Sequence, residues 1–215
     1  MFYRKRIFMG DYAGKAIYYD RKTKEAVYAP KSFLLNTEGA KRTNTLIPML
    51  VVLFMFSCTN LFMIKKLFNM GTYTEKTLYY IVLIWLIESI FLVGIVELAL
   101  YKNVRTAKLA TEYAFRQATF KNLISEQRNG KTEQGNIIYM KVLSAIILLL
   151  LLLPVVYVIT YQDLIGKAIG NEIFRTIILG LVIPVNIIVF NQNSPVRFFK
   201  TMQLYNQNKI KFKEE

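Results

Sequence analysis

Apolar residues are gathered into four long blocks instead of being spread along the chain. The clearest block is residues 78–101, LYYIVLIWLIESIFLVGIVELALY, whose only ionisable side chains apart from tyrosine are Glu88 and Glu97. At a helical rise of about 1.5 Å per residue, such a run spans the roughly 30 Å hydrocarbon core of a bilayer. Three further blocks lie at residues 44–64, 141–161 and 175–191. The pattern therefore predicts an all-α membrane domain with four transmembrane helices.

Residues 1–36 follow a different, strand-like pattern. Three extended pieces, residues 3–9, 15–20 and 25–29, are separated by clusters of glycine and charged residues, and Pro30 closes the third. This predicts a small cytoplasmic β meander, which is marginal alone and would rest on the membrane domain or on a partner. A basic, partly ordered leader is the alternative.

Residues 102–136 form the longest polar connection, with helix formers from 104 to 127. Apolar side chains recur there at helical spacing and predict an amphipathic cytoplasmic helix with one stripe: Leu109, Tyr113, Phe120 and Ile124. Such a stripe either packs on neighbours within the protein or forms a partner-binding face.

The tail, residues 195–215, alternates aromatic and basic side chains. This pattern predicts a basic amphipathic segment at the membrane interface. Its apolar side would enter the acyl boundary and its cations would lie among anionic lipid headgroups.

Charge indicates orientation. The chain has 28 Lys and Arg against 14 Asp and Glu, and these cations flank the apolar blocks, which favours lipid headgroups over nucleic acid as partners. Of the 28, 23 fall in the N-terminal segment, the 102–141 connection and the tail, and five fall in the other two loops. Both termini are therefore predicted to be cytoplasmic. The basic start lacks an apolar core of signal-peptide length, so we expect no cleaved leader.

The few polar side chains inside the blocks are the candidate site residues. Glu88 lies near the middle of its block, where a carboxylate is costly and needs a partner or a wet cavity. It is interpreted as an ion or proton relay, a contact for a partner's helix, or a protonated carboxyl that binds Asn60 or Asn186. Glu97 projects from the opposite face at about 100° per residue and lies near the cytoplasmic end, where headgroup water or a lysine would satisfy it.

Other residues in the blocks concern helix shape and contacts. Asn60 and Asn186 can hydrogen-bond another helix, although Asn60 can equally touch interfacial water. Pro154 and Pro184 predict kinks, with Asn186 placed to cap backbone loosened by Pro184. Gly94 is expected to allow a close helix approach.

The sequence shows no catalytic or metal-binding motif. There is no histidine, and the single cysteine, Cys58, lies in an apolar block, so no intramolecular disulfide and no metal cluster are expected. No phosphate-binding glycine loop, nucleophile elbow or catalytic dyad appears. We expect no enzyme activity and no cofactor. A carrier would show internal repeats or more polar residues along its spans, which leaves a binding protein in the membrane.

The layout resembles that of a known group of proteins. A strand-rich, tyrosine-rich N-terminal piece, RIFMGDYAGKAIYYDRKTKEAVY, precedes bundled apolar spans and a basic tail in a Lys-, Asn- and Ile-rich chain. This is similar to the small polytopic membrane immunity proteins of Gram-positive bacteria, in particular the tandem five-transmembrane family. The chain differs from that family in having four apolar blocks instead of five.

The resemblance implies a function and a location. Members of that family protect the producing cell against membrane-depolarising toxins exported by type VII secretion. The resemblance therefore implies a multi-pass protein of the bacterial cell membrane that binds a cognate toxin, with Glu88, Asn60 or Asn186 giving polar specificity. Two alternative functions remain open: a small channel or transporter subunit, and a subunit for assembly of a membrane complex. The protein could also form an oligomer.

Overall fold

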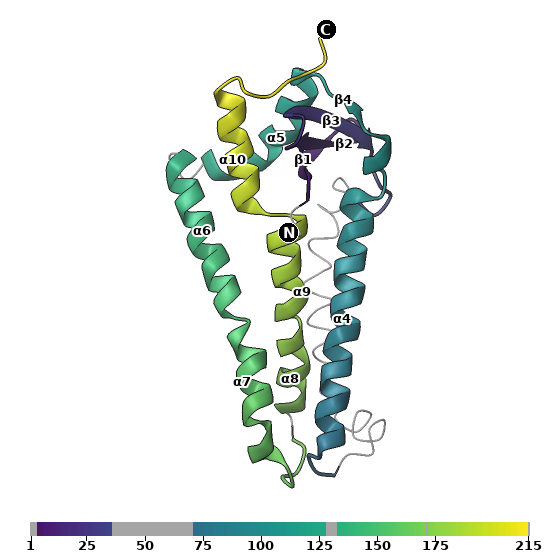
Figure 1. Ribbon diagram of the computed structural model, residues 1–215, viewed down its shortest axis with the longest axis vertical. Coiled ribbons are helices and arrows are strands. Elements are labelled where there is room, and N and C mark those ends of the chain that lie inside the picture. The colour runs from purple at the N-terminus through teal and green to yellow at the C-terminus, as the bar shows by residue number, and fades with distance from the viewer. Residues whose placement is uncertain (1–3, 36–70, 128–132, 171, 215) are drawn as a thin grey trace. The chain divides into compact units, whose positions relative to one another are not determined.

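The computed structural model describes residues 4–127, except 36–70, and residues 133–214, except 171. The described chain is mostly helical and carries one small antiparallel sheet (Figure 1). It divides into two compact units. The sheet unit comprises the described residues of Met1–Leu35, Val93–Ile147 and Ile187–Glu215, and the helical unit comprises those of Asn36–Leu92 and Leu148–Asn186.

The predicted N-terminal meander is confirmed, and it gains a strand. Strands β1 (Arg6–Tyr12), β2 (Lys15–Asp20) and β3 (Glu25–Pro30) pair antiparallel in the order β1-β2-β3. A two-residue strand, β4 (Lys108–Leu109), adds to β3 from the polar connection. The sequence pattern placed the first turn too early, because Gly10 lies inside β1 next to a bulge. Gly10 has φ +148°, and a Cβ there would lie 2.3 Å from the carbonyl oxygen of Ala118.

Both faces of the sheet are buried within the sheet unit. On one face, Ile7, Met9, Ile17 and Tyr19 pack with Phe115 and Ala118 of α5 (Glu112–Gln127) and Met202 of α10 (Pro195–Asn206). On the other face, Ala16, Tyr18, Val27 and Ala29 pack with Leu100 and Tyr101 at the end of α4 (Glu75–Tyr101). Alternate residues of β2 and β3 therefore enter different cores, as the two-residue period of a strand requires.

The turn between β2 and β3 is built around one carboxylate. Asp20 Oδ2 accepts a hydrogen bond from Arg6 Nε at 3.0 Å, and Asp20 Oδ1 accepts one from the backbone N–H of Lys22 at 2.9 Å. Burial alone raises the pKa of Asp20, but the hydrogen bonds from Arg6 and from the Lys22 and Thr23 amides outweigh it, so its pKa lies below the ordinary value. Asp20 is therefore ionised at neutral pH and fixes the turn.

The polar connection and the tail differ from their predictions. A 3₁₀ turn (Val104–Thr106) and β4 precede α5, so the helix begins at Glu112 and not near residue 104. The predicted stripe is also wrong as a packing face, because Leu109, Tyr113 and Phe120 are exposed while Phe115, Ala118 and Thr119 are buried. In the tail, Phe199, Met202 and Ile210 are buried among protein side chains, so they do not form an apolar face for lipid.

Three of the described helical segments are long and apolar enough to cross a membrane: Glu75–Thr106, Ile137–Leu164 and Arg175–Asn206. They correspond to the predicted spans at 78–101, 141–161 and 175–191, whereas the predicted span at 44–64 lies outside the described residues. The first segment begins three residues earlier than predicted, because Thr74 and Thr77 cap the start of the helix. Thr74 N–H donates to Thr77 Oγ1 at 3.1 Å, and Thr77 N–H donates to Thr74 Oγ1 at 3.4 Å.

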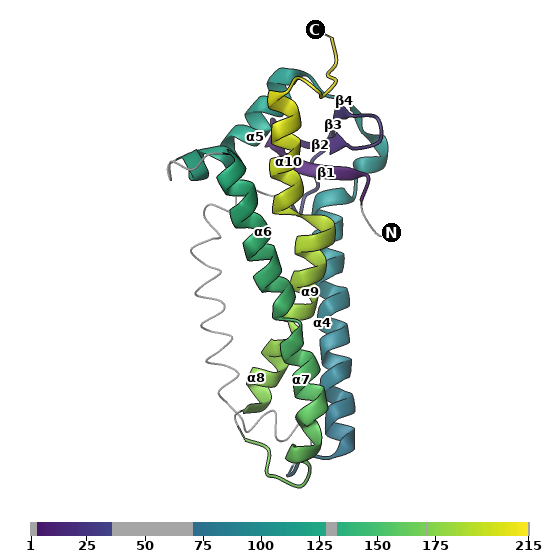
Figure 2. The ribbon, with the colours of Figure 1, turned by 60° about the vertical axis from the view of Figure 1, so that its left-hand side comes forward.

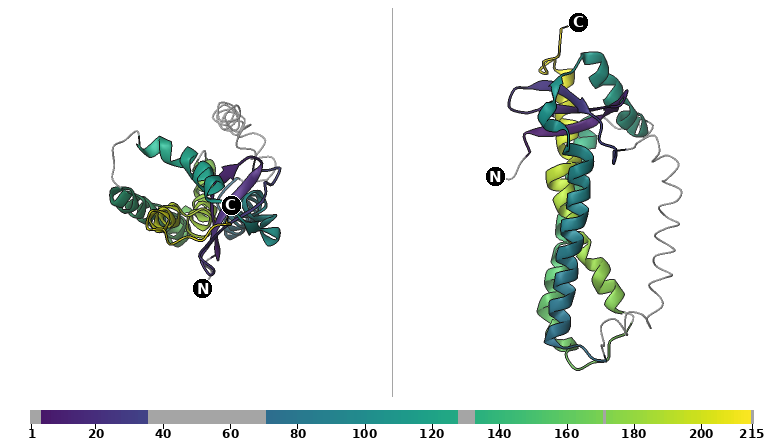
Figure 3. Two further views of the ribbon diagram at one scale, coloured as in Figure 1. Left: turned by 90° about the horizontal axis from the view of Figure 1, so that it is seen from above. Right: turned by 90° about the vertical axis from the view of Figure 1, so that its right-hand side faces the viewer.

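The second and third segments are interrupted near their prolines. α6 (Glu133–Leu149) gives way to α7 (Leu152–Thr160) three to four residues before Pro154, where Leu151 N–H donates to the carbonyl of Leu148 at 3.0 Å. α8 (Glu172–Gly180) gives way to α9 (Val182–Ile187) in the same position relative to Pro184. Proline has no backbone N–H to donate to the carbonyl four residues earlier, and its ring crowds that carbonyl. The helix therefore breaks there. α8 is set at an angle to α9 (Figure 2; Figure 3, right).

A tight helix contact in the helical unit joins α4 and α8. The Trp85 indole N–H donates to the Thr176 carbonyl at 2.9 Å, and a Cβ added at Gly180 would lie 2.0 Å from Trp85 Cδ1. At Gly94, by contrast, an added Cβ would meet no described atom within 4 Å. The close approach predicted at Gly94 is therefore wrong for the described helices, and Gly180 provides it instead.

Replacing Gly180 with alanine should destabilise the protein by about 1–3 kcal/mol, because the added methyl group overlaps the Trp85 ring in a packed interface. The matched variant Gly94→Ala should be neutral or slightly stabilising, since alanine favours the helix by up to about 1 kcal/mol. Thermal unfolding of both variants in detergent micelles, followed by Trp85 fluorescence, measures the difference. Equal melting temperatures for the two variants would contradict this packing.

Candidate functional site

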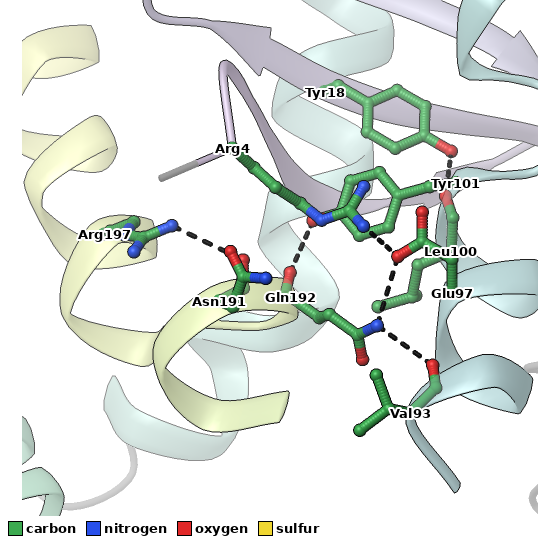
Figure 4. Close-up of polar contacts among 9 residues, drawn as sticks. All are labelled: Arg4, Tyr18, Val93, Glu97, Leu100, Tyr101, Asn191, Gln192 and Arg197. Atoms are coloured by element: carbon green, nitrogen blue, oxygen red, sulfur yellow. Dashed lines mark hydrogen bonds and ion pairs between the residues drawn. The ribbon is translucent and has the colours of Figure 1, made fainter. Parts of the chain in front are cut away.

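Three segments that are distant in sequence meet in a polar cluster of the sheet unit, shown in Figure 4. Arg4 precedes β1, Glu97 and Tyr101 lie in the last turns of α4, and Gln192 ends a π-helix (Ile188–Gln192). Arg4 Nη2 forms an ion pair with Glu97 Oε2, and Gln192 Nε2 donates to the same oxygen at 3.1 Å. The carboxylate of Glu97 is therefore held by two donors from other parts of the chain.

The π-helix explains how Gln192 reaches α4. Its wider turn is closed by a hydrogen bond from Asn193 N–H to the Ile188 carbonyl at 2.8 Å, five residues back. Gln192 is 3% exposed, and its Nε2 also donates to the carbonyl of Val93 at 3.0 Å. Gln192 thereby links the third apolar segment to the first through two acceptors on α4.

Aromatic residues enclose this cluster. The Arg4 guanidinium lies 4.0 Å from the centroid of the Tyr101 ring, a cation–π contact. The Tyr101 hydroxyl donates to the Gln192 carbonyl, and the Tyr18 hydroxyl of β2 donates to the Leu100 carbonyl (Figure 4). The last carbonyls of a helix lack partners within it, so Tyr18 satisfies one of them and ties the sheet to α4.

Three buried polar atoms in and beside the cluster are left unpaired among the described residues, one of them a donor, Arg4 Nε. Asn191 Oδ1 and Gln192 Oε1 are buried, and neither has a hydrogen-bond partner in the described part of the chain. Arg197 donates hydrogen bonds to two backbone carbonyls of the π-helix, that of Phe190 and, at 3.5 Å, that of Asn191. The chemistry of the cluster is therefore that of a structural joint between helices, with its one carboxylate already paired.

Glu88 has a different environment, in the helical unit. It lies seven residues after Ile81, within about 20° of the same helix face, and Ile81 and Trp85 on this face are 2% and 4% exposed. Its Oε2 atom is buried and has no hydrogen-bond partner among the described residues. The outward side chains of α4, such as Ile87, Ile90 and Phe91, are mostly exposed. Glu88 therefore points to the packed side of α4.

Of the two asparagines that the sequence singled out, Asn60 and Asn186, the structure describes only Asn186. Asn186 is buried, and its Nδ2 donates to the Val182 carbonyl of its own helix at 2.9 Å, one turn back. It thus bonds backbone next to the break at Pro184. Asn60 lies outside the described residues.

Sequence reasoning missed Arg4, Gln192 and Tyr101. It expected Glu97 to reach headgroup water or a lysine, whereas the structure gives it Arg4 and Gln192. The only available signal was the polar run Asn191-Gln192-Asn193 directly after an apolar block. Such runs normally mark the exit from a membrane, so the signal alone does not identify a contact.

The described residues contain no candidate metal centre. No group of three or more His, Cys, Asp or Glu that could hold a metal ion occurs in the part of the chain that the structure describes. Comparison of the chain with protein-family models, with curated proteins and with solved structures finds no match. The site is therefore interpreted from its own geometry.

The Arg4–Glu97 pair should stabilise the protein cooperatively. Both side chains are partly exposed, 27% and 39%, so solvent screening limits their coupling to about 0.5–1.5 kcal/mol. A double-mutant cycle with Arg4→Ala and Glu97→Gln, measured by chemical unfolding in micelles, should yield this coupling energy. The control cycle pairs Glu97→Gln with Lys200→Ala, an exposed cation on α10, and should give a value near zero. Additive effects for Arg4 and Glu97 would contradict the observed pair.

Proposed function

We propose that the protein is a non-enzymatic, multi-pass protein of the bacterial cell membrane that binds and neutralises a membrane-targeting antibacterial toxin. The membrane location is supported by the large apolar side chains that stay exposed along the described helices. Ile90 is 66% exposed, Phe91 65% and Ile159 71%. Such surfaces are stable in lipid and are available to another protein's helices there. The immunity role itself rests on the resemblance in layout.

The internal polar groups support a binding role over catalysis. Glu97 and Gln192 bond to other described parts of the same chain, so they join segments instead of presenting reactive groups. A protein of this kind would act stoichiometrically, by occupying helices that the toxin needs to assemble a pore.

The proposed orientation places the sheet unit in the cytoplasm. The segments that carry the strands, α5 and the tail contain most of the Lys and Arg, and positive residues stay on the cytoplasmic side. Asp163, at the end of the second described apolar segment, and Lys167, in the loop that follows it, are exposed and would then lie outside the cell.

A conducting subunit is the second candidate, and one observation favours it. Glu88 faces the packed side of α4 with a buried oxygen that has no described partner. An intramembrane carboxylate of this kind marks ion or proton pathways in many membrane proteins.

The two functions separate in one experiment. Membrane potential is recorded in a bacterium that expresses the product of the neighbouring gene, with and without this protein. We expect the wild-type protein to prevent depolarisation and to cause no ion leak when expressed alone. Because Glu88 points inward, Glu88→Gln should protect as well as Glu75→Gln, the matched control at the exposed start of the same helix.

Two outcomes would overturn the proposal. Depolarisation that proceeds unchanged in the presence of correctly inserted protein removes the immunity role. An ion leak caused by the protein alone, and abolished by Glu88→Gln but not by Glu75→Gln, assigns conduction instead.

A further inference from the structure

The fold brings two basic segments of the sheet unit together. Lys211 N–H donates to the Lys24 carbonyl at 2.9 Å, and Ala26 N–H donates to the Lys211 carbonyl at 3.0 Å, so the C-terminal segment runs parallel to the start of β3. The β2–β3 turn and this segment carry six exposed cations, which we name the basic edge: Arg21, Lys22, Lys24, Lys209, Lys211 and Lys213. These backbone hydrogen bonds hold the two basic segments side by side.

The cations of the basic edge are not used within the described chain. Its ion pairs among the described residues are Arg4–Glu97, Arg6–Asp20 and Lys31–Asp11. None of these involves the basic edge. Six adjacent like charges repel one another, and an external anion that neutralises them relieves this repulsion.

The side-chain pattern of the segment points to a soluble partner instead of lipid. Ile210 is buried and Phe212 half-buried in the core beside Phe115, while the lysines at 209, 211 and 213 are exposed. An interfacial membrane segment places apolar side chains beside its cations on the outer face. Here the apolar side chains of the segment face the core, so the exposed face offers charge without an apolar anchor.

The backbone of the segment offers a second recognition element. Lys211 uses both its N–H and its carbonyl toward β3, and Lys213 N–H donates to the Ala110 carbonyl at 2.9 Å on the same side. The N–H and C=O of one planar trans peptide point in opposite directions, so the Ile210 carbonyl and both backbone groups of Phe212 face the outer edge. Neither residue makes a backbone hydrogen bond within the described part of the chain. An outer edge with free backbone groups is a template for a further strand.

Charge decides what can occupy this edge. A second copy of the same edge would set lysines against lysines, which is destabilising for paired strands. A strand with acidic side chains at every second position would instead place carboxylates beside Lys209, Lys211 and Lys213.

We propose that the basic edge binds an extended acidic segment of another protein by strand addition to residues 210–212. This binding is independent of any toxin contact inside the membrane. The backbone hydrogen bonds hold the segment, and the alternating carboxylates select it over neutral chains.

The test uses the full chain in nanodiscs of zwitterionic lipid and a fluorescein-labelled peptide in which glutamate alternates with threonine. Fluorescence anisotropy should show saturable binding that weakens as salt rises. The triple variant Lys209→Gln, Lys211→Gln and Lys213→Gln should weaken binding by about tenfold or more, because it removes the three cations that the carboxylates of the peptide would pair with. The matched triple variant Lys102→Gln, Arg105→Gln and Lys200→Gln removes the same charge from exposed positions elsewhere and should bind nearly as wild type.

Backbone pairing has its own readout. The same peptide, N-methylated at alternate residues, loses donors for the ladder and should bind much more weakly to the wild-type protein. Equal binding of the methylated and unmethylated peptides would overturn strand addition, and so would equal effects of the two triple variants. Attachment of the nanodiscs to phosphatidylglycerol vesicles through the same three lysines, without peptide binding, would overturn the proposal in favour of lipid headgroups.

Discussion

Burial of the last turns of α4 beneath the sheet is the contact on which the sheet unit depends. Leu100 and Tyr101 pack against Ala16, Tyr18, Val27 and Ala29, and the Tyr18 hydroxyl satisfies the Leu100 carbonyl. A meander of this size is marginal alone, because one exposed face would remain apolar. The end of an apolar helix supplies the missing cover, and α5 with α10 covers the other face. One helix therefore contributes both to the span and to the sheet unit's core.

The polar cluster follows from the same arrangement. Glu97 lies one turn before Tyr101 on a mostly apolar helix, so its carboxylate needs donors close by. Arg4 arrives with the strand that the helix end supports, and the π-helix turns Gln192 toward the same oxygen. These side chains thus join the sheet, α4 and the π-helix, and removal of any one of them leaves a charged or polar group without a partner.

The sequence was informative where the pattern is local. Apolar length identified the three long apolar helices that the structure describes, and strand alternation with turn residues placed β2 at its observed bounds, Lys15–Asp20. It failed where long-range packing decides. The stripe through Tyr113 and Phe120 has the right period, yet Phe115 and Ala118 are buried because β1 approaches α5 at Gly10. The tail has the composition of an interfacial segment, yet the sheet core takes its apolar side chains. The partners of Glu97 were unpredictable because they lie 93 and 95 residues away along the chain.

The proposed topology has the apolar helices crossing the membrane and the sheet unit in the cytoplasm. It is tested by cysteine accessibility in intact cells, in a chain whose single cysteine, Cys58, is replaced by serine. Single cysteines are introduced at Lys24 in the β2–β3 turn and at Asp163, and are labelled with a membrane-impermeant maleimide. We expect labelling of Asp163→Cys in intact cells and of Lys24→Cys only after the membrane is opened. The reverse result would contradict the orientation, and labelling of both in intact cells would contradict a membrane crossing between them.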